Sequence, residues 1–161
     1  MSDTPVTESL PTCRVVRPGQ RTHAKQQLLH AAGISADTVG AKGIHMQIAT
    51  IPPLARAKAH KHEAHETALY ILSGKCGVWF GEELEQHLFA GAGEFFYTPA
   101  NMPHLPYNPS EEEACVAVVA RTDPHEDESV VLLEDLDKLF PDPVGGAYKL
   151  PRTHKETSGK R

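Results

Sequence analysis

Residues 68–80 read ALYILSGKCGVWF, in which two short runs of aliphatic, aromatic and β-branched residues flank Gly74. Runs of this length and composition on either side of a turn residue are typical of paired β-strands. Similar runs lie before and after this segment, and glycine, proline or asparagine separates most of them. The predicted strands are residues 44–51, 68–73, 75–80, 84–89, 94–99, 104–108, 114–121 and 129–133.

The spacing of these runs indicates the architecture. No helical repeat separates them, which favours an all-β, antiparallel sandwich or barrel over a parallel α/β sheet. Residues 114–121 (ACVAVVAR) are apolar at both alternating sets of positions, so both faces of this strand should be covered. Because a barrel covers only its inner face, the outer face requires the N-terminal arm or a second subunit. We therefore predict a homodimer.

The flanking segments lack the strand pattern. Residues 1–43 indicate an extended arm, with an edge strand around 14–17 and one short helix at 22–32 that ends at Gly33. Residues 134–140 predict a C-terminal helical turn before Pro141, and the chain beyond it predicts a flexible basic tail. The expected organisation is an arm at 1–43, a β-domain at 44–133, and a turn with a tail at 134–161.

Composition excludes several classes of protein. The net charge of -5 over 161 residues argues against general binding to nucleic acid. No apolar run approaches the ~20 residues needed to cross a bilayer, so no membrane partner is expected. The N-terminus lacks the basic and apolar regions of a secretory signal, which predicts a cytoplasmic protein. Cys13, Cys76 and Cys115 form no CxxC pair and indicate reduced thiols.

The chain has ten histidines, and three of them fall within AHKHEAHET (59–67). Alternate residues of a strand face the same side, so His60 and His62 can share one cation. Glu66 has the same parity and can add a carboxylate after a short turn, while His104 can close the site from a neighbouring strand. This set suits one divalent metal per chain: iron, manganese, nickel, cobalt, copper or zinc. His65 has the opposite parity and is expected outside the ligand set.

Two segments resemble the motifs of a known family, the cupins. HKHEAHE followed by LYILSG resembles the first cupin motif, and GEFFYTPANMPHLPYN (93–108) resembles the second. The matching residues are His60, His62, Glu66, Gly74, Gly93, Pro99, His104 and Asn108. The resemblance covers roughly residues 44–133.

Three positions depart from the family pattern. Leu54 and Asn101 stand where the motifs usually have glycine, and Glu66 lies one residue further from Gly74 than usual. Asparagine tolerates the left-handed backbone that such a turn requires, so Asn101 fits the motif.

The resemblance implies a small single-domain cupin of the RmlC-like type, an antiparallel jelly roll or β-barrel (double-stranded β-helix) that is often dimeric. It also implies that His60, His62, Glu66 and His104 hold the metal inside. Family members include dioxygenases, decarboxylases, isomerases, epimerases, lyases and binding or sensor domains, so the fold alone does not fix the function.

These observations favour a metalloenzyme that acts on a small oxygenated or carboxylate-bearing molecule. Among reaction classes we favour dioxygenase-type chemistry, because three histidines and one glutamate suit ferrous iron. Glu66 can then detach and act as a base. Two alternatives stay open: a binding or sensing domain without turnover, and a metal-independent isomerase or epimerase that uses histidines as bases.

Overall fold

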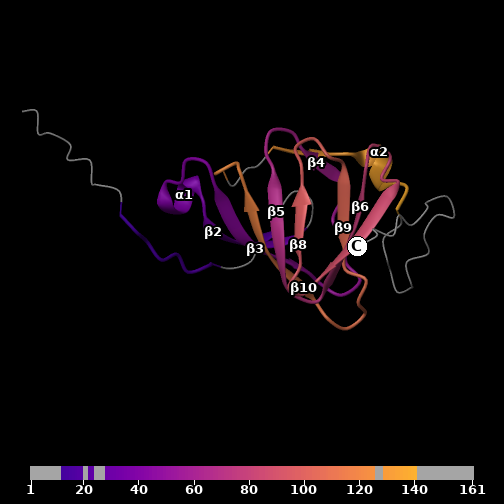
Figure 1. Cartoon of the computed structure of the whole chain (residues 1–161), viewed down its shortest axis with the longest axis horizontal. Helices are drawn as coiled ribbons and strands as arrows, with labels where there is room; N and C mark the ends of the chain where they lie inside the picture. Colours follow the sequence, from indigo (N-terminus) through magenta and orange to yellow (C-terminus); the bar gives the residue numbers. More distant parts are fainter. Residues whose placement is uncertain (1–11, 20–21, 24–27, 126–128, 141–161) are drawn as a thin grey trace, which may run out of the picture.

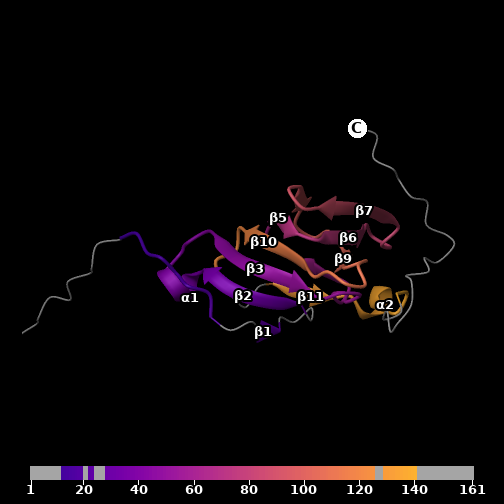
Figure 2. The same ribbon diagram turned by 90° about the horizontal axis from the view of Figure 1, so that it is seen from below.

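The computed structural model describes residues 12–19, 22–23, 28–125 and 129–140. The chain forms two antiparallel sheets that pack face to face as a jelly roll (Figures 1 and 2). The six-stranded sheet has the order β1-β2-β3-β10-β5-β8, and the five-stranded sheet has the order β11-β4-β9-β6-β7. The predicted all-β, antiparallel fold is confirmed.

Each strand predicted between residues 44 and 133 corresponds to an observed one, with ends that agree within one or two residues. The strands are β1 (Thr22–His23), β2 (Leu29–Ile34), β3 (His45–Ile51), β4 (His60–His62), β5 (Thr67–Ser73), β6 (Lys75–Phe80), β7 (Gln86–Gly91), β8 (Phe95–Thr98), β9 (His104–Tyr107), β10 (Cys115–Arg121) and β11 (Val130–Leu132). The helices are α1 (Ala36–Val39) and α2 (Glu134–Asp137). Within the part of the chain that the structure describes, no helix has the length and apolarity needed to cross a membrane.

The N-terminal segment differs from the prediction. The prediction of a helix at 22–32 is wrong, because β1 and β2 form in this segment and β2 pairs with β3. Helix-forming side chains are a weak preference, which backbone pairing at an open sheet edge overrides. The helix of this region is α1, where the Ser35 side chain accepts a hydrogen bond from Thr38 N at 3.1 Å. Residues 12–19 contain no strand, and the predicted tail after residue 140 lies outside the described residues.

One apolar cluster lies on each face of the five-stranded sheet. Between the sheets, Ile71 and Val78 belong to a buried cluster to which both sheets contribute. On the outer face, Trp79 and Phe140 are each 1% exposed, and their rings lie 5.6 Å apart. The segment that contains α2 therefore covers the outer face of this sheet and leaves its inner face to the core.

One ion pair fixes α2 against the sheet. Arg56 Nη1 donates to Asp137 Oδ1 at 2.7 Å, Arg56 Nη2 donates to the Phe140 carbonyl at 2.8 Å, and Ala59 N donates to Asp137 Oδ1 at 2.7 Å. Burial raises the pKa of Asp137, but the hydrogen bonds from Arg56 and Ala59 and the charges of Arg56 and Lys58 outweigh it. The pKa of Asp137 is therefore lowered from its ordinary value.

Left-handed backbone occurs at several motif positions. Asn101 has φ 64°, as its substitution for the usual glycine predicts, and Leu54 has φ 56°. Gly74 and Gly93 have φ of 74° and 87°. They differ in their surroundings: a Cβ on Gly74 would lie 2.6 Å from the Ala114 carbonyl oxygen, whereas nothing lies within 4 Å of a Cβ on Gly93.

This contrast predicts different costs for the same substitution. Gly93→Ala should lower the free energy of unfolding by about 1–2 kcal/mol through backbone strain alone. Gly74→Ala should lower the free energy of unfolding by about 1–3 kcal/mol more than Gly93→Ala does, because the backbone at Ala114 must also move. Urea denaturation of the two variants measures the difference, and equal losses would contradict the steric argument.

Candidate metal centre

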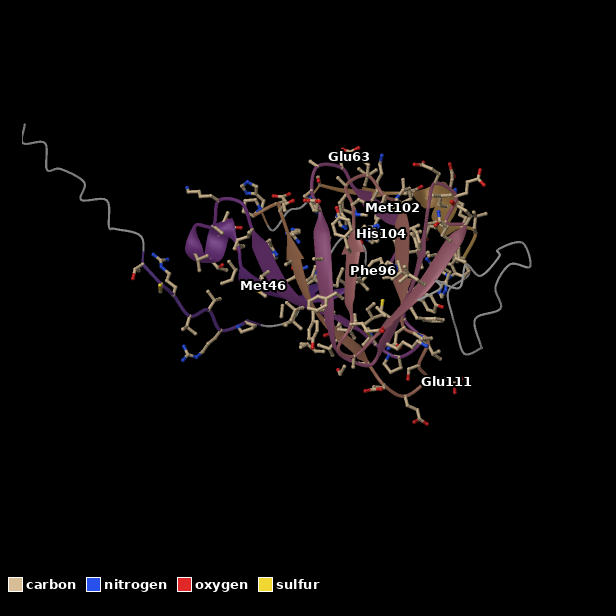
Figure 3. The ribbon with its side chains drawn as sticks, viewed as in Figure 1. Met46, Glu63, Phe96, Met102, His104 and Glu111 are labelled. Atoms are coloured by element: carbon tan, nitrogen blue, oxygen red, sulfur yellow. The ribbon has the colours of Figure 1, made fainter. Side chains whose placement is uncertain are left out.

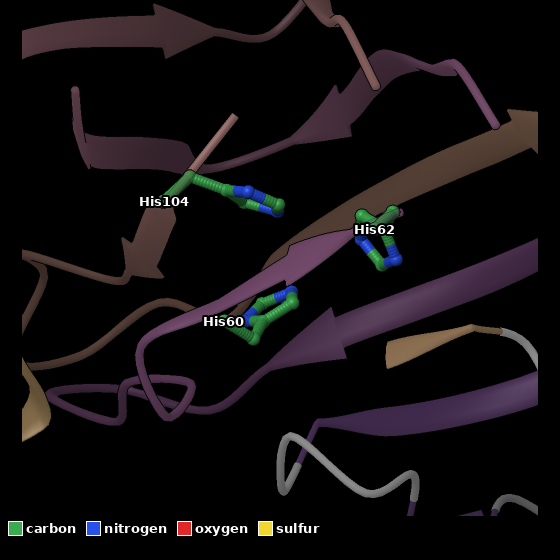
Figure 4. Close-up of side chains that lie close together, drawn as sticks. All are labelled: His60, His62 and His104. Atoms are coloured by element: carbon green, nitrogen blue, oxygen red, sulfur yellow. The ribbon is translucent and has the colours of Figure 1, made fainter. Parts of the chain in front are cut away.

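Three histidines from two neighbouring strands converge between the sheets (Figure 4). His60 and His62 alternate along β4, and His104 begins β9 directly opposite His60. They are 2%, 5% and 6% exposed. The His60 ring centroid lies 4.2 Å from that of His104, and the other two pairs are 5.1 Å apart. Each ring offers one nitrogen such that all three nitrogens lie within 4.8 Å of one another.

Backbone carbonyls fix the orientation of two of the rings. His60 Nδ1 lies 2.6 Å from the Lys58 carbonyl oxygen, and His104 Nδ1 lies 2.8 Å from the Met102 carbonyl oxygen. A carbonyl oxygen can only accept, so each Nδ1 carries the proton and each neutral ring keeps its lone pair on Nε2. Metal-binding histidines are held in the same way, which makes these rings suitable ligands.

The turn between β8 and β9 brings His104 to β4. Asn101 N donates to the His62 carbonyl oxygen at 2.7 Å, which joins the left-handed turn to the strand that carries the other two histidines. At the far end of β9, Asn108 Nδ2 donates to the carbonyl oxygens of Ile51 and Glu113 at 3.0 and 2.7 Å. The second motif therefore supplies one candidate ligand and two backbone anchors.

The structure does not bring Glu66 to the three histidines, in contrast to the prediction. Glu66 is exposed, and its Oε1 accepts a hydrogen bond from Tyr97 Oη at 2.6 Å. That contact also raises the pKa of Tyr97. The parity argument fails because β4 and β5 belong to different sheets, so the turn between them resets which alternate residues face inward. A role for Glu66 as a base at this centre loses its geometric support.

Two further residues lie near the centre: Thr67, which was missed from the sequence, and His65, which was expected outside the ligand set. Thr67 is 7% exposed and lines the same cavity as the three histidines. His65 is 2% exposed, with its ring 4.7 Å from that of His62 and its Nδ1 3.7 Å from Asp123 Oδ2. The spacing in the first cupin motif could have indicated Thr67. Counted back from Gly74, the usual position of the glutamate is residue 67 and not residue 66.

The histidines face a small cavity between the sheets. Its space open to water-sized molecules is about 70 Å³, enough for about five waters or a compact molecule. Figure 3 shows Phe96 and His104 in the interior, whereas Glu63 and Glu111 lie at opposite ends of the molecule. The wall is mostly apolar, and its polar members besides the three histidines include Gln47, Thr67 and Thr98. Among the described lining residues there is no carboxylate.

Two thiols also line this cavity. Cys76 and Cys115 come from opposite sheets, and both are free and buried. A hydrogen bond with Cys115, together with burial, raises the pKa of Cys76 well above its ordinary value. A thiol with a raised pKa stays protonated at neutral pH, so Cys76 packs as an apolar group and is a poor thiolate ligand.

The donor set fits a divalent transition metal. Neutral imidazoles suit zinc, copper, iron and nickel, and three of them leave coordination positions open. Among residues 12–19, 22–23, 28–125 and 129–140, these histidines are the group of three candidate ligands that converges in this way. The fold and the site thus define a metal-binding jelly-roll protein.

The family follows from comparison with known proteins. Residues 47–120 match the family model of the cupin domain, Cupin_2. Over these residues the chain contains a cupin domain, as the two sequence motifs predicted. Among curated proteins, no sequence matches the chain.

Solved structures share the fold at low sequence identity. An oxalate decarboxylase mutant of Bacillus subtilis is 19% identical, with a TM-score of 0.59 over 76% of this chain and 32% of that chain. A formate complex of the Lactobacillus farciminis oxalate decarboxylase is 19% identical, with a TM-score of 0.59 over 74% of this chain and 34% of that chain. A further Bacillus subtilis structure, described by its Mn(II) centres, is 20% identical, with a TM-score of 0.59 over 76% and 32%. This chain spans about a third of the length of these enzymes.

Proposed function

We propose that the protein is a metal-dependent enzyme that acts on a small oxygenated or carboxylate-bearing molecule, with His60, His62 and His104 as metal ligands. The observation that carries the proposal is the convergence of three buried imidazoles on one cavity, with the Nε2 lone pairs of His60 and His104 directed away from their backbone contacts. A divalent metal held there supplies Lewis acidity and open positions for a second ligand.

The charge of the centre favours an anionic substrate. Three neutral imidazoles add no negative charge, so a bound divalent cation keeps its full charge in a largely apolar cavity. A cation in such surroundings attracts an anion more strongly than it would in water. The solved structures described above are oxalate decarboxylases, one of them in complex with formate, which agrees with a small carboxylate as ligand.

The cavity also bears on the reaction type. A metal-independent isomerase or epimerase would need one of the cavity histidines as its positioned base, because no carboxylate is present among the described lining residues, and a histidine that holds a metal is not free for that role. Acids that are already ionised at neutral pH, and diketones that ionise on a metal, need no such base for binding. We therefore keep oxygen-dependent cleavage, the dioxygenase-type chemistry, as the first reaction to test, and decarboxylation as the second.

Anaerobically purified protein loaded with Fe(II), Mn(II) or Zn(II) tests the proposal. Oxalate, acetylacetone and pyruvate are supplied with and without oxygen, while an oxygen electrode and mass spectrometry follow consumption and products. We expect turnover with one of the redox-active metals and none with the His60→Ala variant. Metal and ligand binding without any turnover would instead identify a binding or sensing protein, and no metal uptake would contradict the proposal.

The outer face of the six-stranded sheet supports a homodimer. Phe95, Tyr97 and Leu72 are 79%, 55% and 49% exposed, and Tyr70 packs on Phe95 with ring centroids 4.8 Å apart. The outward positions of β5, β8 and β10 carry no charged side chain. Glu66, hydrogen-bonded to Tyr97, lies next to these strands, but their outward side chains form an exposed apolar face, so we propose that a second copy covers it.

Sedimentation velocity at micromolar concentration tests the dimer. The unmodified chain should sediment as a dimer, and Phe95→Glu should shift it to a monomer by placing a charge in the interface. Phe89→Glu is the matched control, because Phe89 is a 46% exposed phenylalanine on β7 of the other sheet. A monomer in the unmodified chain would contradict the proposal.

A further inference from the structure

Thr67 places a hydroxyl group in the cavity of the three histidines, and no described residue accepts a hydrogen bond from it. It is the first residue of β5, and its side chain lines the cavity that His60, His62 and His104 face. The residue is 7% exposed, and Thr67 Oγ1 is shielded from solvent without a hydrogen-bond partner among the described residues. A buried hydroxyl in this state is uncommon, because losing water without gaining a partner costs free energy.

The surroundings of Thr67 explain why the chain does not satisfy it. Its partner on β10 is Arg121, whose guanidinium donates to the carbonyl oxygens of Asp123 and His125. Its partner on β8 is Thr98, which also lines the cavity, yet no hydrogen bond joins Thr98 to Thr67 Oγ1. The other inward neighbours, Leu69, Phe96 and Val119, offer no side-chain acceptor. Since no described residue accepts from the hydroxyl, a molecule inside the cavity can supply the acceptor.

We infer that Thr67 Oγ1 donates a hydrogen bond to an oxygen atom of the small molecule bound at the three-histidine centre, and that Thr67 is a specificity-determining residue. The inference rests on the proposed function, since it needs a ligand at that centre. A hydroxyl is uncharged, so it does not compete with an anionic ligand for the metal as a carboxylate would. Thr67 thereby selects ligands with a second oxygen atom, such as a dicarboxylate or a diketone.

The test compares binding and metal content in matched variants. Zn(II)-loaded protein is titrated calorimetrically with formate, oxalate and acetylacetone, and its zinc content is measured by mass spectrometry. Thr67→Val keeps the shape and removes the hydroxyl, while Thr67→Ser keeps the hydroxyl. Thr50→Val is the control, because Thr50 is 4% exposed and its Oγ1 also lacks a partner among the described residues, but Thr50 does not line the cavity.

We expect Thr67→Val to bind oxalate or acetylacetone about 10- to 100-fold more weakly at unchanged zinc content. Thr67→Ser should restore the affinity, and Thr50→Val should leave it as it is. Unchanged affinity in Thr67→Val would overturn the inference, since the hydroxyl would then serve only a water molecule. Loss of zinc in Thr67→Val would also overturn it, because Thr67 would then act on the metal. Both results leave the proposed function standing, whereas failure of the unmodified protein to bind zinc or any of the three ligands overturns both.

Discussion

Replacing His104 with alanine should abolish stoichiometric metal binding. His104 supplies one of three converging imidazoles, and it is the one that comes from a second strand. Two ligands on β4 alone leave the ion largely hydrated, so its affinity should fall by at least ~100-fold, which exceeds the usual effect of disturbing a ligand's hydrogen-bond partner. Mass spectrometry of protein loaded with one equivalent of Zn(II) measures the change.

The control is another histidine of the same chain. His125 is exposed and lies outside the cluster, so His125→Ala should keep its zinc. His104→Gln, which preserves most of the side-chain volume, separates the loss of a ligand from the loss of packing. If His104→Ala and His125→Ala bind zinc equally, the three-histidine centre is not the metal site.

Asp137→Ala should destabilise the protein by about 3 kcal/mol. The substitution removes the carboxylate that Arg56 binds at 2.7 Å, and the side chain of Arg56 is only 8% exposed. Breaking a buried pair on one side is costly because the remaining buried charge loses the interaction that compensated it. It also frees Ala59 N and loosens Phe140 from Trp79. Urea denaturation measures the loss.

The same helix provides the control and a pH test. Asp135 pairs with Lys138 at the exposed surface, so Asp135→Ala should leave the unfolding midpoint unchanged. Because the pKa of Asp137 is lower in the folded state, its contribution is present above its ordinary pKa and is lost as the pH falls through the folded value. The difference in the free energy of unfolding between the unmodified protein and Asp137→Ala should stay constant near neutral pH and decrease below about pH 4. A difference independent of pH would contradict the ion-pair argument.

Strands were predictable because their signal is local. Alternating apolar residues bounded by turn residues reflect burial on one face, and every predicted run became a strand. The segment 22–32 failed for the opposite reason. Its side chains favour a helix locally, but the open edge of β3 offers β2 a full set of backbone partners. Only the sheet order determines that such an edge exists.

Part of the candidate site was also local. His60 and His62 share a face because they alternate on one strand, and the second motif carried His104 with its turn residue Asn101. The alternation of faces along β4 does not continue through the turn that follows this strand. Glu66 was expected inside because the alternation was extended through that turn, but it lies outside and is hydrogen-bonded to Tyr97.

The sequence by itself therefore determined the predicted strands of residues 44–133, the cupin domain and the three histidines, because each depends on residue types at short, regular spacing. The tertiary structure alone decided which sheet each strand joins, and with it which alternate residues face the cavity. It turned Glu66 outward, turned Thr67 inward, and brought Cys76 and Cys115 from opposite sheets to one cavity. The physical reason is that a strand has only two faces, and the choice between them depends on the sheet packed opposite it.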